Sequence, residues 1–330
     1  MHRPAFHKPE LKLERRLFAT SALESALVIG YALLLFAVPL LAYVGLAGHG
    51  PAWALGALPL LIPAAYGMFL QGILGHEGFH FNFSDKRLLS CLLGVLCSSI
   101  LTGFCVTGYF VDHWQHHRHS NGPQDPDWRL FRRYRHPLMR MIVSRLQATA
   151  RYLLQTVQLA LPGARVEGRL PLPAQQIRLL ARVNLLCQAG WIVLWAGLAS
   201  HWPVLLPALV VCLLLALLIS GVNAYQEHAF ASDVETPIAR SRTSLLCSLL
   251  HAGSNYHLEH HLYPRVPCWR LPQVHRRLLA SGWYQDRQAL LEPSFIGSFR
   301  YCSSQFPYSG EVQATPERAP ASLEGSGPAR

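Results

Sequence analysis

The chain has 330 residues, of which 51% are hydrophobic and only 14% are charged, and its formal net charge is +11. Because soluble proteins carry about 25% charged residues, this composition excludes an ordinary soluble domain and predicts an all-α protein that crosses a membrane several times. The positive charge is not accompanied by a recognition motif or by a pattern of stacking aromatic residues. Nucleic acid is therefore not expected as a partner.

Four apolar runs are long enough, or nearly so, to cross a bilayer, which takes roughly 20 helical residues. They are residues 22–47, 52–75, 183–200 and 203–222. Short uncharged turns join the first run to the second and the third to the fourth, so we expect two transmembrane hairpins. Three segments are predicted: an amino-terminal segment (1–21), one membrane domain (22–307) and a disordered tail (308–330) rich in Gly, Pro, Ser and Ala.

A fifth apolar run, residues 88–111, separates two histidine-rich motifs. If this run crossed the membrane completely, the motifs on its two sides would face opposite compartments and could not share a site. Its glycines, Gly94, Gly103 and Gly108, favour a broken helix that neighbouring helices shield from lipid. We therefore predict a re-entrant segment that enters the membrane and returns to the same side.

Lysine and arginine indicate the orientation of the chain. They are abundant before residue 22, between residues 112 and 182 and near the carboxyl end, whereas both hairpin tips lack them. The positive-inside rule therefore predicts that both termini and every histidine motif face the cytoplasm. The motifs would then form a histidine-rich cap on one side of the membrane.

Histidines are concentrated in three short motifs. Eight of the seventeen histidines lie there: His76 and His80, then His113, His116 and His117, and finally His257, His260 and His261. The second and third motifs have i, i+3, i+4 spacing, which places all three side chains on one helical face. We expect the three imidazoles of such a motif to converge on one point.

A ninth histidine, His228, follows the fourth apolar run. Imidazole is a ligand of iron, zinc, copper and nickel, so residue type alone does not identify the metal. The number of imidazoles is more informative, because nine exceed the four ligands of a zinc site. They are enough for two metal ions.

Polar residues next to these histidines are candidates for a supporting role. The acids are Glu77, Asp112, Glu227 and Glu259, and the amides are Asn223 and Asn255. A carboxylate commonly accepts the second ring N–H of a metal-bound histidine and so fixes its orientation; the alternative is a solvated charge on a helix. The two amides could hold a metal-bound water, or could cap a helix.

The sequences around two of the motifs resemble those of the membrane fatty acid desaturase superfamily. Residues 113–121 resemble its second histidine box, and residues 255–264 with the Val266-Pro267 that follows resemble its third. The similarity extends over roughly residues 50–285. It implies that the nine histidines hold two non-haem iron ions, that O2 is a co-substrate, and that a fatty acyl chain in the membrane is oxidised.

The same resemblance implies an external electron donor, such as a ferredoxin, a rubredoxin or a cytochrome with its reductase. The chain itself has no CxxC pair and no GxGxxG motif that would indicate a fused electron-transfer domain. The resemblance to small bacterial members of the superfamily predicts a location in a bacterial inner membrane.

Within the superfamily, desaturation is the favoured reaction, and hydroxylation, carotenoid ketolation and oxidative decarboxylation remain open. The segment Asp125-Pro126-Asp127-Trp128 resembles a sequence motif of bacterial carotenoid ketolases. The length of the chain resembles that of bacterial members that convert free fatty acids to terminal alkenes by oxidative decarboxylation. Substrate chain length, headgroup and position of attack are not fixed by these motifs.

Two alternatives lie outside the superfamily. His76-Glu77-Gly78-Phe79-His80 matches the HExxH motif of zinc peptidases, in which the glutamate is a general base. A haem carrier with paired histidines is the other. A peptidase needs one further ligand rather than seven, and haem ligands are usually single residues on facing helices, so both alternatives are disfavoured.

Overall fold

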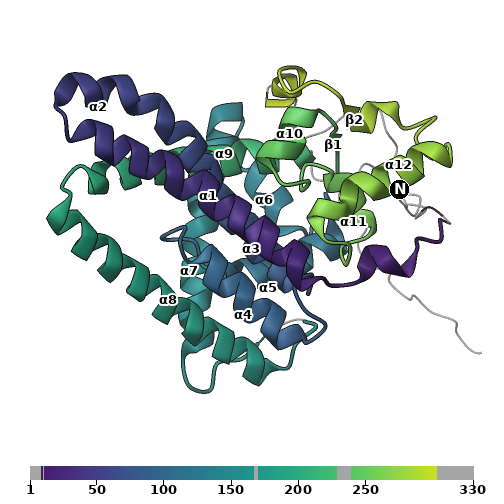
Figure 1. Ribbon diagram of the computed structural model, residues 1–330. Coiled ribbons are helices and arrows are strands. Elements are labelled where there is room, and N and C mark those ends of the chain that lie inside the picture. The colour runs from purple at the N-terminus through teal and green to yellow at the C-terminus, as the bar shows by residue number, and fades with distance from the viewer. Residues whose placement is uncertain (1–8, 10, 167–169, 229–238, 303–330) are drawn as a thin grey trace, which may run out of the picture.

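The computed structural model describes residues 9, 11–166, 170–228 and 239–302, and within these ranges the regular structure of the chain is mostly helical, with very little strand (Figure 1). This confirms the predicted fold class. The two strands found in the described part, β1 (Ser241–Arg242) and β2 (Leu291–Glu292), are two residues long and pair in parallel. The predicted tail at 308–330 lies outside the described residues.

Four helical stretches are long and apolar enough to cross a membrane, and they coincide with the four apolar runs predicted to be spans. They are α1 (Ala22–Ala47), the stretch Pro51–Phe79, α8 (Ala174–His201) and α9 (Leu205–His228). The second consists of α2 (Pro51–Ala57), a 3-10 turn η2 (Leu58–Leu60) and α3 (Leu61–Phe79). Large apolar side chains point outwards from these helices: Leu23 is 70% exposed and Leu186 is 72% exposed. A lipid-facing surface explains this exposure.

The fifth apolar run is broken, as predicted, into α4 (Arg87–Ser98) and α5 (Val106–His119). Neither helix is long enough to cross a bilayer. Helix α4 packs closely on α3, where a Cβ atom on Gly94 would lie 2.9 Å from the Cα of Gly78. The segment returns to its starting point, because Nε2 of His80 before it lies 2.9 Å from Nε2 of His113 after it.

The polar region after α5 contains more structure than its composition indicates. It forms α6 (Pro126–Arg132), a π-helical turn η3 (Met139–Val143) and the long helix α7 (Ser144–Ala160). Helix α7 packs against α5, where the N–H of Gly108 donates a hydrogen bond to Oγ1 of Thr156 at 2.8 Å. A side chain at Gly108 would collide with the carbonyl oxygen of Tyr152, so the two helices can approach only because this residue is glycine.

The carboxyl-terminal part gathers at one end of the helix bundle (Figure 1). It comprises α10 (Leu245–Leu250), α11 (His257–Leu262), η4 (Cys268–Arg270), α12 (Leu271–Ala280), η5 (Gln288–Leu290) and η6 (Gly297–Cys302). It has its own small core, and the short helix η1 (Arg15–Phe18) packs there through Leu17. Glu24 of α1 accepts hydrogen bonds of 2.7 Å from Trp269 and Arg270. These bonds connect the carboxyl-terminal part, called the cap below, to the first span.

Candidate metal centre

All nine predicted histidines meet where the cap contacts the ends of α3, α5 and α9. They form two groups, within each of which the candidate ligand atoms all lie within 4.8 Å of one another. The five-histidine group is His76, His80, His113, His117 and His260, and the four-histidine group is His116, His228, His257 and His261. The first and third motifs are neighbours, since Nε2 of His76 lies 3.1 Å from Nε2 of His260.

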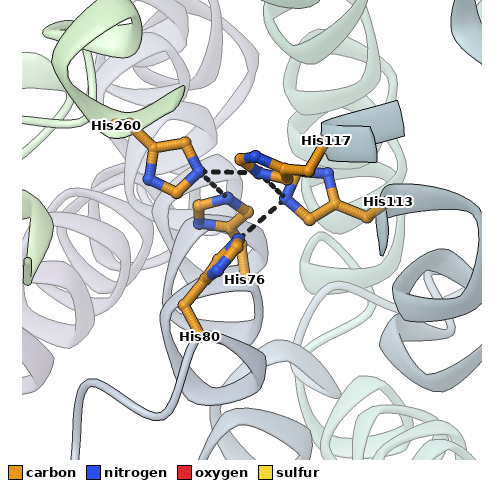
Figure 2. A group of neighbouring side chains, drawn as sticks. All are labelled: His76, His80, His113, His117 and His260. Atoms are coloured by element: carbon orange, nitrogen blue, oxygen red, sulfur yellow. Dashed lines mark hydrogen bonds between the residues drawn. The ribbon is translucent and has the colours of Figure 1, made fainter. Parts of the chain in front are cut away.

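In the five-histidine group the Nε2 atoms point to a common centre (Figure 2). Nε2 of His113 lies 2.9 Å from that of His80 and 2.9 Å from that of His117. Nε2 of His260 lies 3.0 Å from that of His117. The five rings come from three segments, the carboxyl end of α3, α5 and α11, and none of these supplies more than two, so this arrangement exists only in the folded chain.

The four-histidine group lies beside the first and is built in the same way. Nε2 of His257 lies 2.8 Å from that of His228 and 3.2 Å from that of His261, which in turn lies 3.3 Å from that of His116. The rings of His117 and His261 stack with their centroids 4.4 Å apart. The two groups are therefore immediate neighbours.

The expectation that all three imidazoles of one motif converge on one point is wrong. In α5, His113 and His117 belong to the five-histidine group while His116 belongs to the other. In α11, which has the same spacing, the assignment is reversed. His260 belongs to the five-histidine group, and His257 and His261 belong to the four-histidine group. Each of these helices therefore supplies ligands to both groups.

The second nitrogen of several rings is held from outside the groups. Nδ1–H of His76 donates to Oε1 of Glu77 at 3.0 Å, and that of His113 donates to the hydroxyl of Tyr109 at 2.8 Å. Nδ1–H of His116 donates to both carboxylate oxygens of Asp125 at 3.0 Å. These bonds keep the proton on Nδ1 and leave the lone pair of Nε2 facing the centre of each group.

The protonation state of most of the imidazoles also favours metal binding, because they are neutral. Burial, reinforced by the charges of neighbouring histidines, lowers the pKa of six of them well below the usual range. These six are His80, His113, His117, His257, His260 and His261. They are therefore neutral near pH 7, which is the form that binds a metal. Burial opposes a charge on His116 too, but Asp125 raises its pKa to about 9.

The two groups fit metal ions. Lone pairs that face one another across about 3 Å repel, and a cation between them removes the repulsion. At the usual metal–imidazole distance of about 2.0–2.1 Å, ligands at right angles would have their nitrogens about 3 Å apart. The observed separations of 2.8–3.3 Å agree with this value. Five nitrogens in one group exceed the four ligands of a zinc site.

Of the four acids expected to orient ligands, two lie against histidines. The carboxylate of Glu77 accepts from His76, and Oε2 of Glu227 lies 3.6 Å from Nδ1 of His257. Asp112 instead pairs with Arg151 and accepts a 3.1 Å bond from Gln155, both on α7. The expectation that Asp112 contacts a candidate ligand is therefore wrong. Its carboxylate links α5 to α7 instead.

The expectation that Glu259 contacts a metal-binding histidine of one of the two groups is also wrong. Its fully buried carboxylate accepts hydrogen bonds from Ser241, Tyr284 and Nδ1 of His275, the last at 2.5 Å. These partners lie behind α11 rather than in either group. The carboxylate therefore fixes the helix that carries the third motif, and it touches none of the candidate ligands.

The two asparagines occupy different places. Asn223 lines the cavity beside the histidines, and its Oδ1 accepts a hydrogen bond from Arg242. The side chain of Asn255 instead donates to the carbonyl of Arg242 at 2.5 Å and to Ser248 at 3.2 Å. Asn223 thus remains a candidate for holding a water near the metals, whereas Asn255 braces the backbone of β1.

Sequence reasoning missed Asp125 and Tyr109 as partners of ligands. Asp125 belongs to the motif Asp125-Pro126-Asp127-Trp128, but it lies nine positions after His116, and only the turn before α6 brings the two together. Tyr109 stands four residues before His113 on α5, and its ring stacks on that imidazole with centroids 4.8 Å apart. The i, i+4 spacing was a usable signal for the tyrosine.

A cavity opens beside both groups and joins them to the apolar interior. Its histidine wall includes His76, His113, His116, His228, His257 and His260. Its apolar wall includes Phe69, Ile73, Leu101, Phe104 and Leu271. A long apolar chain bound there would reach the metal ligands while lying out of water.

The peptidase and haem alternatives do not fit this arrangement. Both carboxylate oxygens of Glu77 already accept hydrogen bonds. Oε1 accepts from His76, and Oε2 accepts from the side chain of Asn82 and from the backbone N–H of Cys268, both at 2.8 Å. This glutamate is therefore not free to act as a general base. Two tight groups of imidazoles leave no room for a porphyrin between them.

Helices that can span a membrane, two histidine groups able to hold metal and an adjoining apolar cavity define a membrane-embedded metalloprotein. The chain belongs to the fatty acid desaturase family, whose model matches residues 51–290. It is therefore an oxidoreductase of a family that uses two iron ions. It is also 26% identical over 213 residues to the beta-carotene ketolase of Paracoccus sp. (strain N81106 / MBIC 01143), a match that covers 61% of this chain and 72% of that protein.

Proposed function

We propose that this protein desaturates a fatty acyl chain with O2 and two non-haem iron ions. The observation that carries the proposal is the position of nine convergent imidazoles beside a cavity with an apolar wall. We assign five ligands to one ion and four to the other, as the two groups divide them. When bound, the iron pair supplies the oxidising power needed to remove hydrogen from an unactivated C–H bond.

The residues of the chain hold and orient the reactants. The apolar wall, with Phe69, Leu101 and Phe104, would keep the acyl chain extended and exclude water from the reacting carbon. Glu77, Tyr109 and Asp125 would hold the ligand rings in place, and a rigid site matters because a small displacement of the substrate costs rate. Glu227 supports His257 in the same way.

The partners and the location follow from the same proposal. Electrons would come from a ferredoxin, a rubredoxin or a cytochrome with its reductase. We place the protein in a bacterial inner membrane, with both termini and the histidine groups on the cytoplasmic side, on the strength of the arginine distribution. We also propose that residues 22–307 act as one catalytic unit.

The test is expression of the full chain with a reducing system, followed by iron analysis and mass spectrometry of lipids and volatile hydrocarbons. We expect about two irons per chain and an internal double bond that forms only with O2. His260→Ala should abolish the product, while His119→Ala, outside both groups, should retain it. Absence of an O2-dependent acyl product from the iron-loaded protein would refute the proposal. A terminal alkene would select oxidative decarboxylation instead.

A ketolase reaction is the second candidate, because the Paracoccus relative is a beta-carotene ketolase. Asp125 and Asp127, from the motif noted in the sequence, lie 3.0 and 3.9 Å from Nδ1 of His116. An oxygenated carotenoid in cells that also make beta-carotene would identify this reaction.

A further inference from the structure

One cationic side chain reaches the cavity beside the histidines. Arg145, the second residue of α7, lines the same cavity as His113 and His116. Its Nε is buried and has no hydrogen-bond partner. Its guanidinium carbon lies 5.7 Å from the ring centroid of Phe104, on the apolar wall. Among the described residues, no carboxylate lies within ion-pair distance of Arg145.

The neighbouring charges are already matched. Arg151, one helical turn and a half further along α7, pairs with Asp112. Asp127 also lines the cavity, but it accompanies His116, with 3.9 Å between Oδ2 and Nδ1. The base of the Arg145 side chain packs against α9, since a Cβ on Gly221 would lie 3.2 Å from the Cβ of Arg145. The base of the side chain is therefore held beside α9, and the guanidinium at the cavity has no ion pair with a carboxylate among the described residues.

We propose that Arg145 binds the free carboxylate of a fatty acid substrate. This rests on the proposed function and narrows it to unesterified acids. Arg145 is partly buried, with its Nε shielded from water, and a cation that is partly removed from water is stabilised by pairing with an anion. The planar guanidinium matches a carboxylate with two parallel hydrogen bonds, and few other ligand groups use that fork as fully. A carotene has no group that would satisfy it.

The proposal predicts which form of an acyl chain is bound. A fatty acid presents the two oxygens of a charged carboxylate to Arg145. Its methyl ester is of nearly the same size but presents only a neutral carbonyl oxygen. Wild-type protein should therefore prefer the acid, and the preference should depend on the charge at residue 145. A residue that merely supports the fold would affect acid and ester alike.

The experiment uses the full iron-loaded chain in detergent and measures displacement of a fluorescent fatty acid by palmitate and by methyl palmitate. Arg145→Gln should weaken palmitate binding by about 10- to 100-fold and leave methyl palmitate within about twofold. Arg145→Lys, which keeps the charge but not the fork, should lie between. The matched control is Arg133→Gln, at an exposed arginine after α6, which should change neither affinity.

Three results would overturn the assignment: equal affinity of wild-type protein for acid and ester, an equal loss of both in Arg145→Gln, or no loss of either. Iron content of each variant shows whether the fold is kept. The proposed function is tested separately by O2-dependent acyl products of the wild type. If such products form only from thioesters or phospholipids, that function stands and the role of Arg145 as a carboxylate site fails.

Discussion

Among single residues, Asp125 holds His116 from outside the two groups with both of its carboxylate oxygens. It is 1% exposed, and besides His116 it accepts from the backbone N–H groups of Asn121 and Asp127 at 2.8 and 2.9 Å. We expect Asp125→Asn to lower iron affinity or turnover by about 10- to 100-fold, since one of the two acceptor oxygens becomes an NH2 donor. Iron per chain, by mass spectrometry, and the rate of O2-dependent product formation measure this.

Asp286→Asn is the matched control, because that carboxylate is exposed on the cap. It should leave both quantities at the wild-type value. If Asp125→Asn also keeps full iron content and full rate, the carboxylate is not needed to orient His116.

At the scale of the helix, the division of the histidine motifs has a simple cause. With 3.6 residues per turn, residue i+4 is rotated by about 40° from residue i, whereas residue i+3 is rotated by about 60° in the opposite direction. Residues i and i+4 therefore face one centre and residue i+3 faces the other. Both α5 and α11 obey this rule. The rule could have been applied to the sequence, but which centre each pair faces depends on the neighbouring helices.

The contact between α5 and α7 is expected to be intolerant of side chains. In Gly108→Ala the new Cβ would lie 2.0 Å from the carbonyl oxygen of Tyr152, so the helices must separate. We expect a loss of about 1–3 kcal/mol in the free energy of unfolding, as for other overpacked sites. Thermal unfolding in detergent, followed by circular dichroism, measures it.

Gly190→Ala provides the comparison, because a Cβ there has no neighbour within 4 Å on α8. It should be neutral or stabilising by up to about 1 kcal/mol, since alanine is the better helix former. Equal effects of the two substitutions would mean that the α5–α7 contact is not tight.

For the molecule as a whole, the two histidine groups predict that folding and metal loading are linked. A metal that binds only the folded chain stabilises it by about 2.7 kcal/mol when present at 100 times its dissociation constant. Removal of iron by a chelator should therefore lower the melting temperature, and added Fe(II) should restore it. His119→Ala should show the same shift, whereas the shift should shrink in His260→Ala. A melting temperature unaffected by chelation in wild-type protein would contradict this link.

The sequence alone was sufficient to locate the long apolar helices and the histidines that come together, but not the contacts around them. Apolar length located the four long helices, and motif spacing located all nine histidines. Helix α7 was missed because its arginines made residues 112–182 look uniformly polar, although one face of the helix is buried. Contacts such as those of Asp112 and Glu259 depend on which helix lies alongside, and adjacency in sequence does not reveal that.

Because α5 and α11 each contribute histidines to both groups, two bound ions would be held by the same two helices. A movement of α11 that released one ion would also pull a ring away from the other, so each ion would stabilise the binding of its neighbour. Singly loaded chains should consequently be scarce, and the population should divide between empty and doubly filled molecules. An iron titration would then show a sigmoidal curve.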